Sequence, residues 1–325
     1  MFWERLFSHS LVLVFASVLV VRPSMVPAVA LAALLLSLAP LFLAWQSSRG
    51  LAIRPVVSWA FAAVCLGLIS QGFALSEPLA LGRPIAGHWA YLSTLATFAA
   101  LISALGARKP GGGAWAILMG LLVLVLLIPW LEGSGLKNGS GGLDRLSIDA
   151  PWSIFYGLLV VAGISNYLPT VFGRASCLVG ASLIAEFVGL YQTEWTASRR
   201  ALIWSVSPFL LGIGINQALA DFRRRSHVEP GLPSLWFWFR DLWGVVWALR
   251  VKERFQRTSQ MAGWPISLTW NGPTALDGSP LSTTPAEATK TLETLLRRFA
   301  DASRLAEAQA GRESGACSSG RSSPE

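Results

Sequence analysis

The stretch VPAVALAALLLSLAPLFLAW, residues 26–45, contains no charged side chain and decides the class of fold. A helix rises about 1.5 Å per residue, so about 20 apolar residues cross the roughly 30 Å of hydrocarbon in a bilayer. Six further stretches meet or nearly meet this requirement: 56–75, 85–106, 113–131, 152–171, 175–192 and 201–220. An eighth, Leu6 to Val21, is short and resembles the apolar centre of a signal peptide, but no small-residue cleavage site follows it. The sequence therefore predicts an all-α polytopic membrane protein with a bundle of about eight transmembrane helices in residues 1–220.

The distribution of charge supports this class. Only 14% of the 325 residues are charged, whereas roughly a quarter are charged in a typical soluble domain. Residues 1–220 hold 12 basic and 7 acidic side chains, while the much shorter segment 221–325 holds 14 and 11. The net charge of +8 does not indicate a nucleic-acid partner, because the basic residues lie mainly at the ends of apolar runs, where topology places them. The lipid bilayer is thus the expected partner of residues 1–220.

The positive-inside rule predicts the orientation of the bundle. With the N-terminus inside, the loops on that side carry nine Lys and Arg residues and the opposite loops carry six. Arg223, Arg224 and Arg225 directly follow the last span and favour this orientation, whereas Arg199 and Arg200 argue against it. We expect a multi-pass protein of the inner or plasma membrane with both termini in the cytoplasm.

Residues 221–311 are predicted to form a cytosolic tail with three elements. The segment 235–257 carries apolar and aromatic residues at helical spacing, but Arg240 and Asp241 at its centre make it a poor span. Its tryptophans and basic C-terminal end instead predict an amphipathic helix in the membrane interface. A short strand is expected at 264–270, without an identified partner, and an amphipathic helix at about 285–310. Residues 312–325 have a low-complexity composition typical of disorder.

Glu186 is the leading candidate for a functional side chain. It lies in VGASLIAEFVGLY, about six residues or 9 Å from the outer end of the seventh span. An ionised carboxylate alone in hydrocarbon costs several kcal/mol, so we expect Glu186 to be buried between helices and protonated or hydrogen-bonded. Ala181, Ala185 and Gly189 form a stripe of small residues that would let a neighbouring helix enclose it. Either a binding role for a proton or substrate, or a structural role in helix packing, fits this position.

His88 and Gln71 complete the candidate intramembrane polar site. Both lie toward the same outer end of the predicted bundle as Glu186, on the fourth and third spans. No sequence feature shows that these three spans touch. There is no motif for a metal, a cofactor or a catalytic nucleophile: Cys65, Cys177 and Cys317 form no ligand pattern, and no HExxH or glycine-rich phosphate loop is present. We therefore expect no cofactor and no metal.

Three functions fit the sequence. The first is a membrane-embedded interaction or assembly protein whose cytosolic tail docks a protein partner, because intramembrane polar groups are few and the tail helices need surfaces to cover them. The second is a transporter or carrier with Glu186 in its path, although no inverted repeat is visible. The third is an enzyme that acts on a lipid-linked substrate at the outer face, which lacks a reaction-specific motif. A polar cavity that reaches Glu186 would favour the second or third function, and a dry packed bundle would favour the first.

Overall fold

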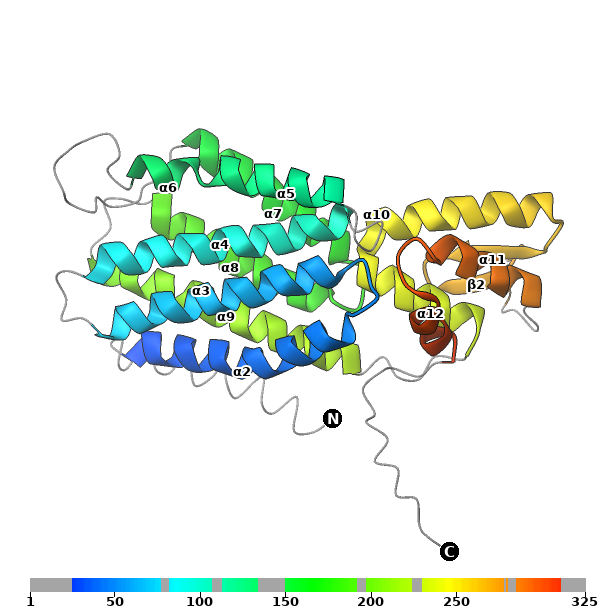
Figure 1. Ribbon diagram of the computed structural model, residues 1–325, viewed down its shortest axis with the longest axis horizontal. Helices are drawn as coiled ribbons and strands as arrows, with labels where there is room; N and C mark the ends of the chain where they lie inside the picture. The colour runs from blue at the N-terminus through cyan, green and yellow to red at the C-terminus, as the bar shows by residue number, and fades with distance from the viewer. Residues whose placement is uncertain are drawn as a thin grey trace, which may run out of the picture.

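The protein consists of a long helical bundle with a smaller unit attached to one of its ends (Figure 1). The computed structural model describes residues 25–76, 82–106, 113–133, 150–191, 197–223, 230–277, 279 and 285–310. The first predicted span, Leu6 to Val21, and the C-terminal segment 312–325 lie outside these residues. We call α2 to α9 the bundle and residues 230–310 the tail unit. The described chain is helical except for one two-stranded hairpin, which confirms the predicted all-α class.

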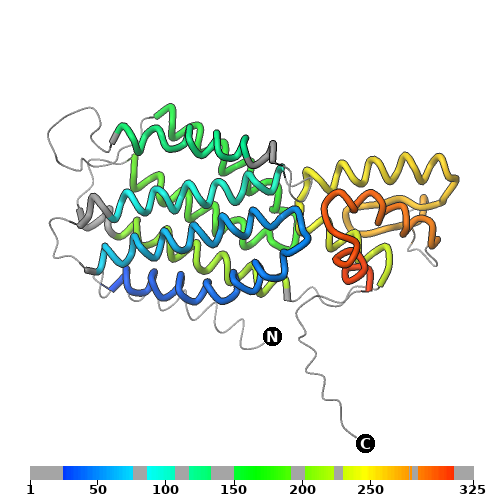
Figure 2. The backbone as a smooth tube through the Cα atoms, viewed as in Figure 1, coloured from blue at the N-terminus to red at the C-terminus, as the bar shows by residue number. Residues whose placement is uncertain are grey.

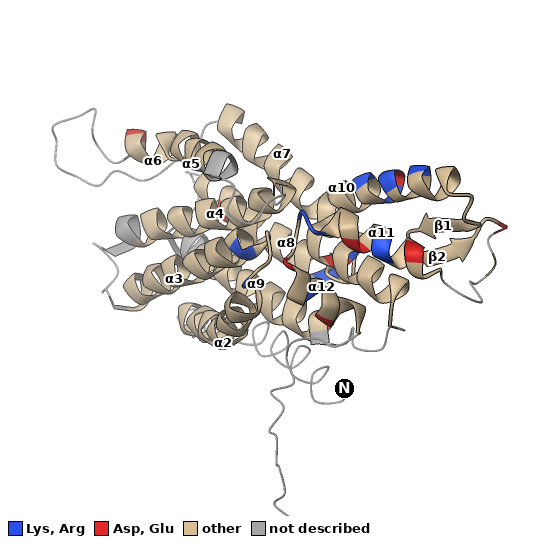
Figure 3. Cartoon of the chain, turned by 45° about the vertical axis from the view of Figure 1, so that its right-hand side comes forward, with Lys and Arg blue, Asp and Glu red and all other residues tan. Residues whose placement is uncertain are grey.

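The bundle helices run roughly parallel to one another along the long axis of the molecule (Figure 2). They are α2 (Val26–Ser47), α3 (Arg54–Ser76), α4 (Gly82–Gly106), α5 (Gly113–Leu126), α6 (Ile128–Gly133), α7 (Ala150–Tyr167), α8 (Gly173–Tyr191) and α9 (Ala197–Arg223). Within the described residues, five stretches are long and apolar enough to cross a membrane: Val26–Ser47, Arg54–Leu75, Ala86–Gly106, Gly173–Tyr191 and Leu202–Phe222. Charged side chains are concentrated in the tail unit and at its junction with the bundle (Figure 3).

The predicted span 113–131 forms two helices, α5 and α6, that meet at Leu127. The hydrogen bonds Leu127 N to Val123 O and Leu131 N to Leu127 O continue the helical pattern across this point. The break arises because Pro129 has no N–H and its ring disfavours a regular preceding turn. At the same place, the carbonyl of Leu126 at the end of α5 accepts a hydrogen bond from Tyr91 Oη of α4, at 2.6 Å.

Helix α7 carries an exposed apolar face. Ile154, Leu158 and Val161 are 66%, 63% and 65% exposed, and they lie at helical spacing on one side of the helix. Helix α5 presents a similar face through Ile117, Leu121 and Leu124. Such continuous apolar surface is typical of helices that face lipid.

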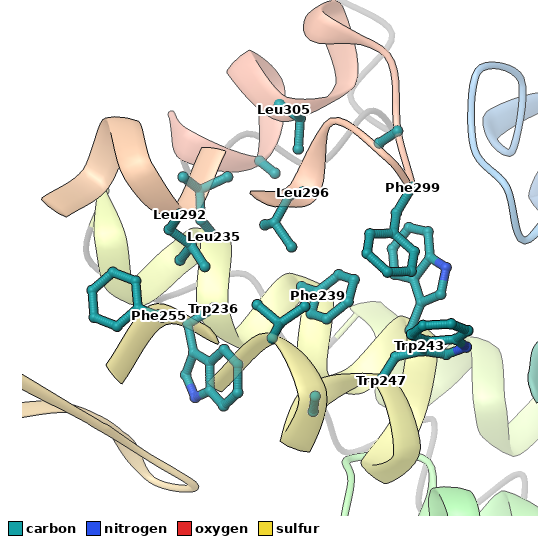
Figure 4. Packing of buried hydrophobic residues seen from close by; sticks show 14 of the residues in the cluster. Leu235, Trp236, Phe239, Trp243, Trp247, Phe255, Leu292, Leu296, Phe299 and Leu305 are labelled. Carbon is teal, nitrogen blue, oxygen red and sulfur yellow. The ribbon is translucent and has the colours of Figure 1, made fainter. Parts of the chain in front are cut away.

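The core of the tail unit is aromatic and is built on α10 (Leu232–Met261). Gly244 has φ 75° and ψ −172°, so it divides α10 into two helical segments. Trp236, Phe239 and Trp243 are completely buried in a hydrophobic cluster that also contains Leu292 of α11 and Leu305 of α12 (Figure 4). The Trp-rich face predicted for the membrane interface is therefore covered by the chain itself. Helical periodicity shows that a face is buried but does not show what buries it.

The tail unit also accommodates Arg240 and Asp241, the two charged residues at the centre of the predicted 235–257 helix. Their side chains form an ion pair at 2.7 Å, and Arg240 Nη1 donates a hydrogen bond to the carbonyl of Trp270. The Arg240 guanidinium also lies over the rings of Phe237 and Trp270. The pair thus ties α10 to the β-hairpin.

The hairpin and the last two helices differ from the prediction in detail. The predicted strand 264–270 forms β1 (Ile266–Thr269), and its partner β2 (Gly272–Ala275) follows immediately in antiparallel register, with Thr269 opposite Gly272. The predicted helix 285–310 is two helices, α11 (Ala286–Leu296) and α12 (Ala302–Gln309). The chain leaves the helical conformation between them because its backbone pairs with the α2–α3 connection: Ala52 N donates to Phe299 O, and Asp301 N donates to Gly50 O.

A second contact between bundle and tail unit is centred on Gly244. Asn166 of α7 donates from Nδ2 to Trp243 O, and its Oδ1 accepts from Val246 N. Trp247 Nε1 donates to Leu105 O at the end of α4. A Cβ at Gly244 would collide with Asn166, so only glycine permits this approach. The tail unit is therefore fixed to the ends of several bundle helices.

Candidate functional site

Glu186 lies inside the bundle, on α8, about 7.5 Å along the helix from its last residue, Tyr191. The residue is 1% exposed. The hydroxyl of Ser207 on α9 is hydrogen-bonded to its carboxyl group. Among the described residues, no donor reaches the carboxyl oxygen Oε1. Glu186 is thus buried between helices, as its sequence context predicts.

The small residues around Glu186 pack differently from the prediction. Ala181 is exposed and Ala185 is only partly buried, so the predicted stripe of small residues does not form the helix interface. Gly189 is buried against the indole of Trp204 on α9. Ser182 lies one turn before Glu186, and its hydroxyl donates to the carbonyl of Ser207 at 2.7 Å. The buried face of α8 is thus the one that carries Ser182, Glu186 and Gly189.

Pro208 of α9 determines how Gln71 of α3 is bound on the opposite side of the site. A proline inside a helix has no N–H, so the carbonyl four residues earlier loses its usual donor. In α9 that carbonyl belongs to Trp204, and Gln71 Nε2 of α3 donates to it at 3.2 Å. This contact fixes the orientation of the amide, because a carbonyl oxygen accepts only from the NH₂ side. Gln71 is 1% exposed, and its Oε1 has no donor within the described part of the chain.

A cavity lies between α3, α4, α8 and α9, and both Gln71 and Glu186 line it. Eight of its thirteen lining residues are polar. Besides Gln71 and Glu186, the polar lining residues are Ser70 on α3, Ser93, Thr94 and Thr97 on α4, Ser182 on α8 and Ser207 on α9. The space in which the centre of a water molecule could lie is about 10 Å³, which is close to the minimum for one water-sized particle. Most of the described residues around the cavity thus carry a side-chain oxygen, and the space suits a single small occupant.

The hydroxyl groups of α3 and α4 donate their protons away from the cavity. Ser70 donates to Ala86 O at 2.8 Å, and Ser93 donates to Ala63 O at 2.7 Å. Thr94 and Thr97 donate to carbonyls four residues earlier on α4. Because each hydroxyl has one proton, only oxygen lone pairs remain for other partners. The walls of the cavity thus present hydrogen-bond acceptors.

The structure brings together two of the three predicted site residues. Helices α3 and α4 pack together, and α4 and α8 are in contact, so the three predicted spans meet. Gln71 and Glu186 share the cavity, whereas His88 does not line it. The ring of His88 lies edge-on to Trp130, 6.3 Å between centroids, on the side of α6. His88 is buried but belongs to a different contact.

The hydroxyl residues and Pro208 were missed by the sequence prediction. Ser93, Thr94 and Thr97 are a polar group in an otherwise apolar helix, which is a usable signal. Serine and threonine in membrane helices, however, commonly bond their own helix backbone, so the type alone does not indicate a site.

The described residues contain no group of three or more His, Cys, Asp or Glu side chains that could hold a metal ion. Comparison with known proteins finds no matching family model, no similar curated protein and no similar solved structure. Function must therefore be argued from the geometry of the cavity.

Proposed function

We propose that this protein is a membrane carrier whose bundle binds a small solute in the cavity around Glu186. The observation that carries the proposal is the small cavity between four helices, with a buried carboxyl group in its wall. Burying polar groups in a membrane is costly, and residues that do so are commonly part of a solute or ion pathway. Pro208 contributes indirectly, because it frees the carbonyl of Trp204, which holds the amide of Gln71 at the cavity.

The proposed carrier crosses the membrane eight times, with both termini in the cytoplasm. In support, α5 with α6 and α7 add two apolar elements to the five long spans, and Leu6 to Val21 would supply the eighth. The connections 48–53 and 168–172 both meet the tail unit, so they lie at one end of the bundle. The count of basic residues in the loops favours the cytoplasmic side for this end. The tail unit would then be a cytosolic domain.

Reporter fusions after Arg49, Gly139 and Arg225 test this topology. A reporter active only in the cytoplasm is expected to work after Arg49 and Arg225, and one active only outside is expected to work after Gly139. External activity at Arg225 would refute the orientation.

The structure gives less support to an assembly protein that docks a partner through its tail helices. The apolar faces of α10, α11 and α12 cover one another, so they need no outside surface. An enzyme that uses Glu186 on a lipid-linked substrate would need an open site, and Glu186 is 1% exposed. Carrier function requires only that the cavity become accessible to water from one side at a time during a transport cycle.

Cysteine accessibility distinguishes a carrier from a packed scaffold. In a variant with Cys65, Cys177 and Cys317 replaced by serine, we would introduce Thr97→Cys into the cavity wall. Thr97 is suitable because its hydroxyl bonds only its own helix, at Ser93 O. If the cavity opens to water, a small positively charged thiol reagent should modify this cysteine in membranes.

Leu158→Cys is the matched control, because this side chain lies on the exposed apolar face of α7. A charged reagent should not react there, since the thiol would remain in hydrocarbon. Modification of Thr97→Cys no faster than Leu158→Cys would refute the carrier and favour a scaffold.

A further inference from the structure

The cavity contains oxygen acceptors that lack a donor. Gln71 is held through Nε2 by Trp204 O, so the atom that it offers to the cavity is Oε1. Within the described residues, neither this oxygen nor Glu186 Oε1 accepts a hydrogen bond. Both residues are 1% exposed, so bulk water does not satisfy them. A buried acceptor without a donor costs about 1–3 kcal/mol, which indicates that an occupant supplies the missing interaction.

The chemistry of the walls defines that occupant. The hydroxyls of Ser70, Ser93 and Thr97 have already donated their protons, so they too offer only lone pairs. A site with a carboxylate, an amide oxygen and hydroxyl oxygens, and without nitrogen or sulfur ligands, suits a hard cation. An anion would be repelled by the carboxylate of Glu186 and by the unpartnered oxygen of Gln71. A small cation would satisfy these acceptors and the charge of the carboxylate together.

We propose that the cavity binds one desolvated monovalent metal cation, with Glu186 as its charged ligand and Gln71 Oε1 as a neutral ligand. The proposal rests on the carrier function proposed above, because it names the solute for the same cavity. Glu186 is the only ionisable residue among those that line the cavity. One monovalent cation leaves the pair neutral, whereas a divalent cation would leave a net charge in a medium of low dielectric constant. The volume of about 10 Å³ admits one such ion without a shell of water.

A proton competes with the cation for the carboxylate. When the cation enters, the proton of Glu186 leaves to bulk water, and when the proton returns, the cation is released. Other ionisable residues on the helices that contact α8 include His88 and Tyr91 of α4, Tyr156 of α7 and Asp221 of α9. The two tyrosine hydroxyls are hydrogen-bonded to each other and to Leu126 O, away from the cavity lining. Cation affinity should therefore rise with pH.

Equilibrium binding of radioactive Na⁺ to the purified full-length protein in detergent tests the proposal, with K⁺ and Ca²⁺ as competitors. The wild type should bind Na⁺ saturably and more tightly as pH rises. Glu186→Gln keeps the shape of the side chain and removes its charge, so it should abolish saturable binding without lowering the thermal unfolding temperature. Gln71→Leu should weaken binding about tenfold, the effect of losing one good ligand.

Asp221→Asn is the matched control. Asp221 is also a largely buried carboxyl group on α9, but it lies 14 residues, or about 21 Å, beyond Ser207. It accepts a hydrogen bond from Gln217 and does not line the cavity. This variant should bind Na⁺ like the wild type.

Several results would overturn the cation site. The first is that the wild type binds neither Na⁺ nor K⁺ saturably at any pH. The second is that it binds Ca²⁺ more tightly than it binds either Na⁺ or K⁺. The third is that Glu186→Gln binds Na⁺ as tightly as the wild type does. If Glu186→Gln does not fold, Gln71→Leu takes its place in the test, and an unchanged Na⁺ affinity of Gln71→Leu would also overturn the cation site. Binding of K⁺ in preference to Na⁺ would support the site and define its selectivity. If Thr97→Cys is modified but no cation binds, the carrier remains and only the identity of its solute is wrong.

Discussion

Replacing Gly244 by alanine should detach the tail unit from the bundle. Gly244 combines φ 75° with ψ −172°, a backbone region that is essentially restricted to glycine and costs other residues about 1–3 kcal/mol. A Cβ at this position would also lie closer than 3.0 Å to Nδ2, the backbone oxygen and Cγ of Asn166. Relief of this collision requires α10 to move away from α7. The two hydrogen bonds between Asn166 and α10 would then be lost, at about 0.5–1.5 kcal/mol each.

Together these effects predict a loss of about 2–6 kcal/mol in the free energy of unfolding. The chain offers a matched control in Gly263, which also has a positive φ, 69°, but has open space where a Cβ would lie. Gly263→Ala should cost only the backbone strain of about 1–2 kcal/mol. The difference between the two variants therefore measures the collision with Asn166.

Denaturant titration of the purified protein in detergent, followed by tryptophan fluorescence, measures both variants. Trp243 and Trp247 lie beside Gly244 at the junction, so their emission reports separation of the tail unit. Limited trypsin digestion gives a second readout, since the exposed Arg254 and Arg257 lie on α10. Equal stability of Gly244→Ala and Gly263→Ala would show that α10 does not approach α7 in this way.

Two further variants test the tail core and the cavity wall. Arg240→Met should destabilise the tail unit by about 1.5–3 kcal/mol, because it removes the ion pair with the buried Asp241 and the hydrogen bond to Trp270 O; an unchanged free energy of unfolding in denaturant titration would contradict this. Pro208→Ala should raise the thermal unfolding temperature and weaken Na⁺ binding severalfold, because the new N–H competes with Gln71 for the carbonyl of Trp204. Lower stability with unchanged Na⁺ affinity would contradict the role assigned to Pro208.

The bundle helices could be predicted closely from the sequence, and the reason is physical. A bilayer requires every backbone group to be bonded within the helix, so an apolar run of sufficient length has one solution. The run 26–45 corresponds to α2 (Val26–Ser47), and 175–192 corresponds to α8 (Gly173–Tyr191). The tail unit lacks this constraint. Its aromatic face at Trp236 and Trp243 could be buried by lipid or by protein with the same periodicity, and only the packing of α11 and α12 decides between them.

The break between α11 and α12 shows a second limit. The segment 285–310 has one continuous apolar stripe, which predicts one helix. The structure interrupts it where Ala300 forms a β-bridge with Leu51, almost 250 residues earlier in the chain. The backbone groups of Phe299 and Asp301 bond to this distant segment rather than to a helical turn. No local pattern reveals such a contact.

For the candidate site, the depth of the polar residues along their helices could be predicted from the sequence, but which of these residues lie together could not. The cost of a carboxyl group in hydrocarbon singled out Glu186, and a similar predicted depth selected both Gln71 and His88. Only the packing of α3 and α4 against α8 and α9 shows that Gln71 shares the cavity and His88 does not. The role of Pro208 could not be predicted from the sequence either, because it depends on the packing of α3 against α9. Only this packing brings Gln71 to the carbonyl of Trp204.

The composition of the cavity argues for binding rather than for packing alone. Leucine or alanine at these positions would fill the same interface without polar groups that need partners, and buried polar groups are often no more stabilising than apolar residues of similar volume. Here four helices contribute oxygen atoms to one small space, and two of the most buried of these oxygens accept no hydrogen bond from any described residue. A proline in the facing helix removes one further backbone hydrogen bond at the same place. The unpartnered oxygens lower the stability of the empty bundle and support the proposal that the cavity takes an occupant. The carboxyl group of Glu186 among them supports a cation as that occupant.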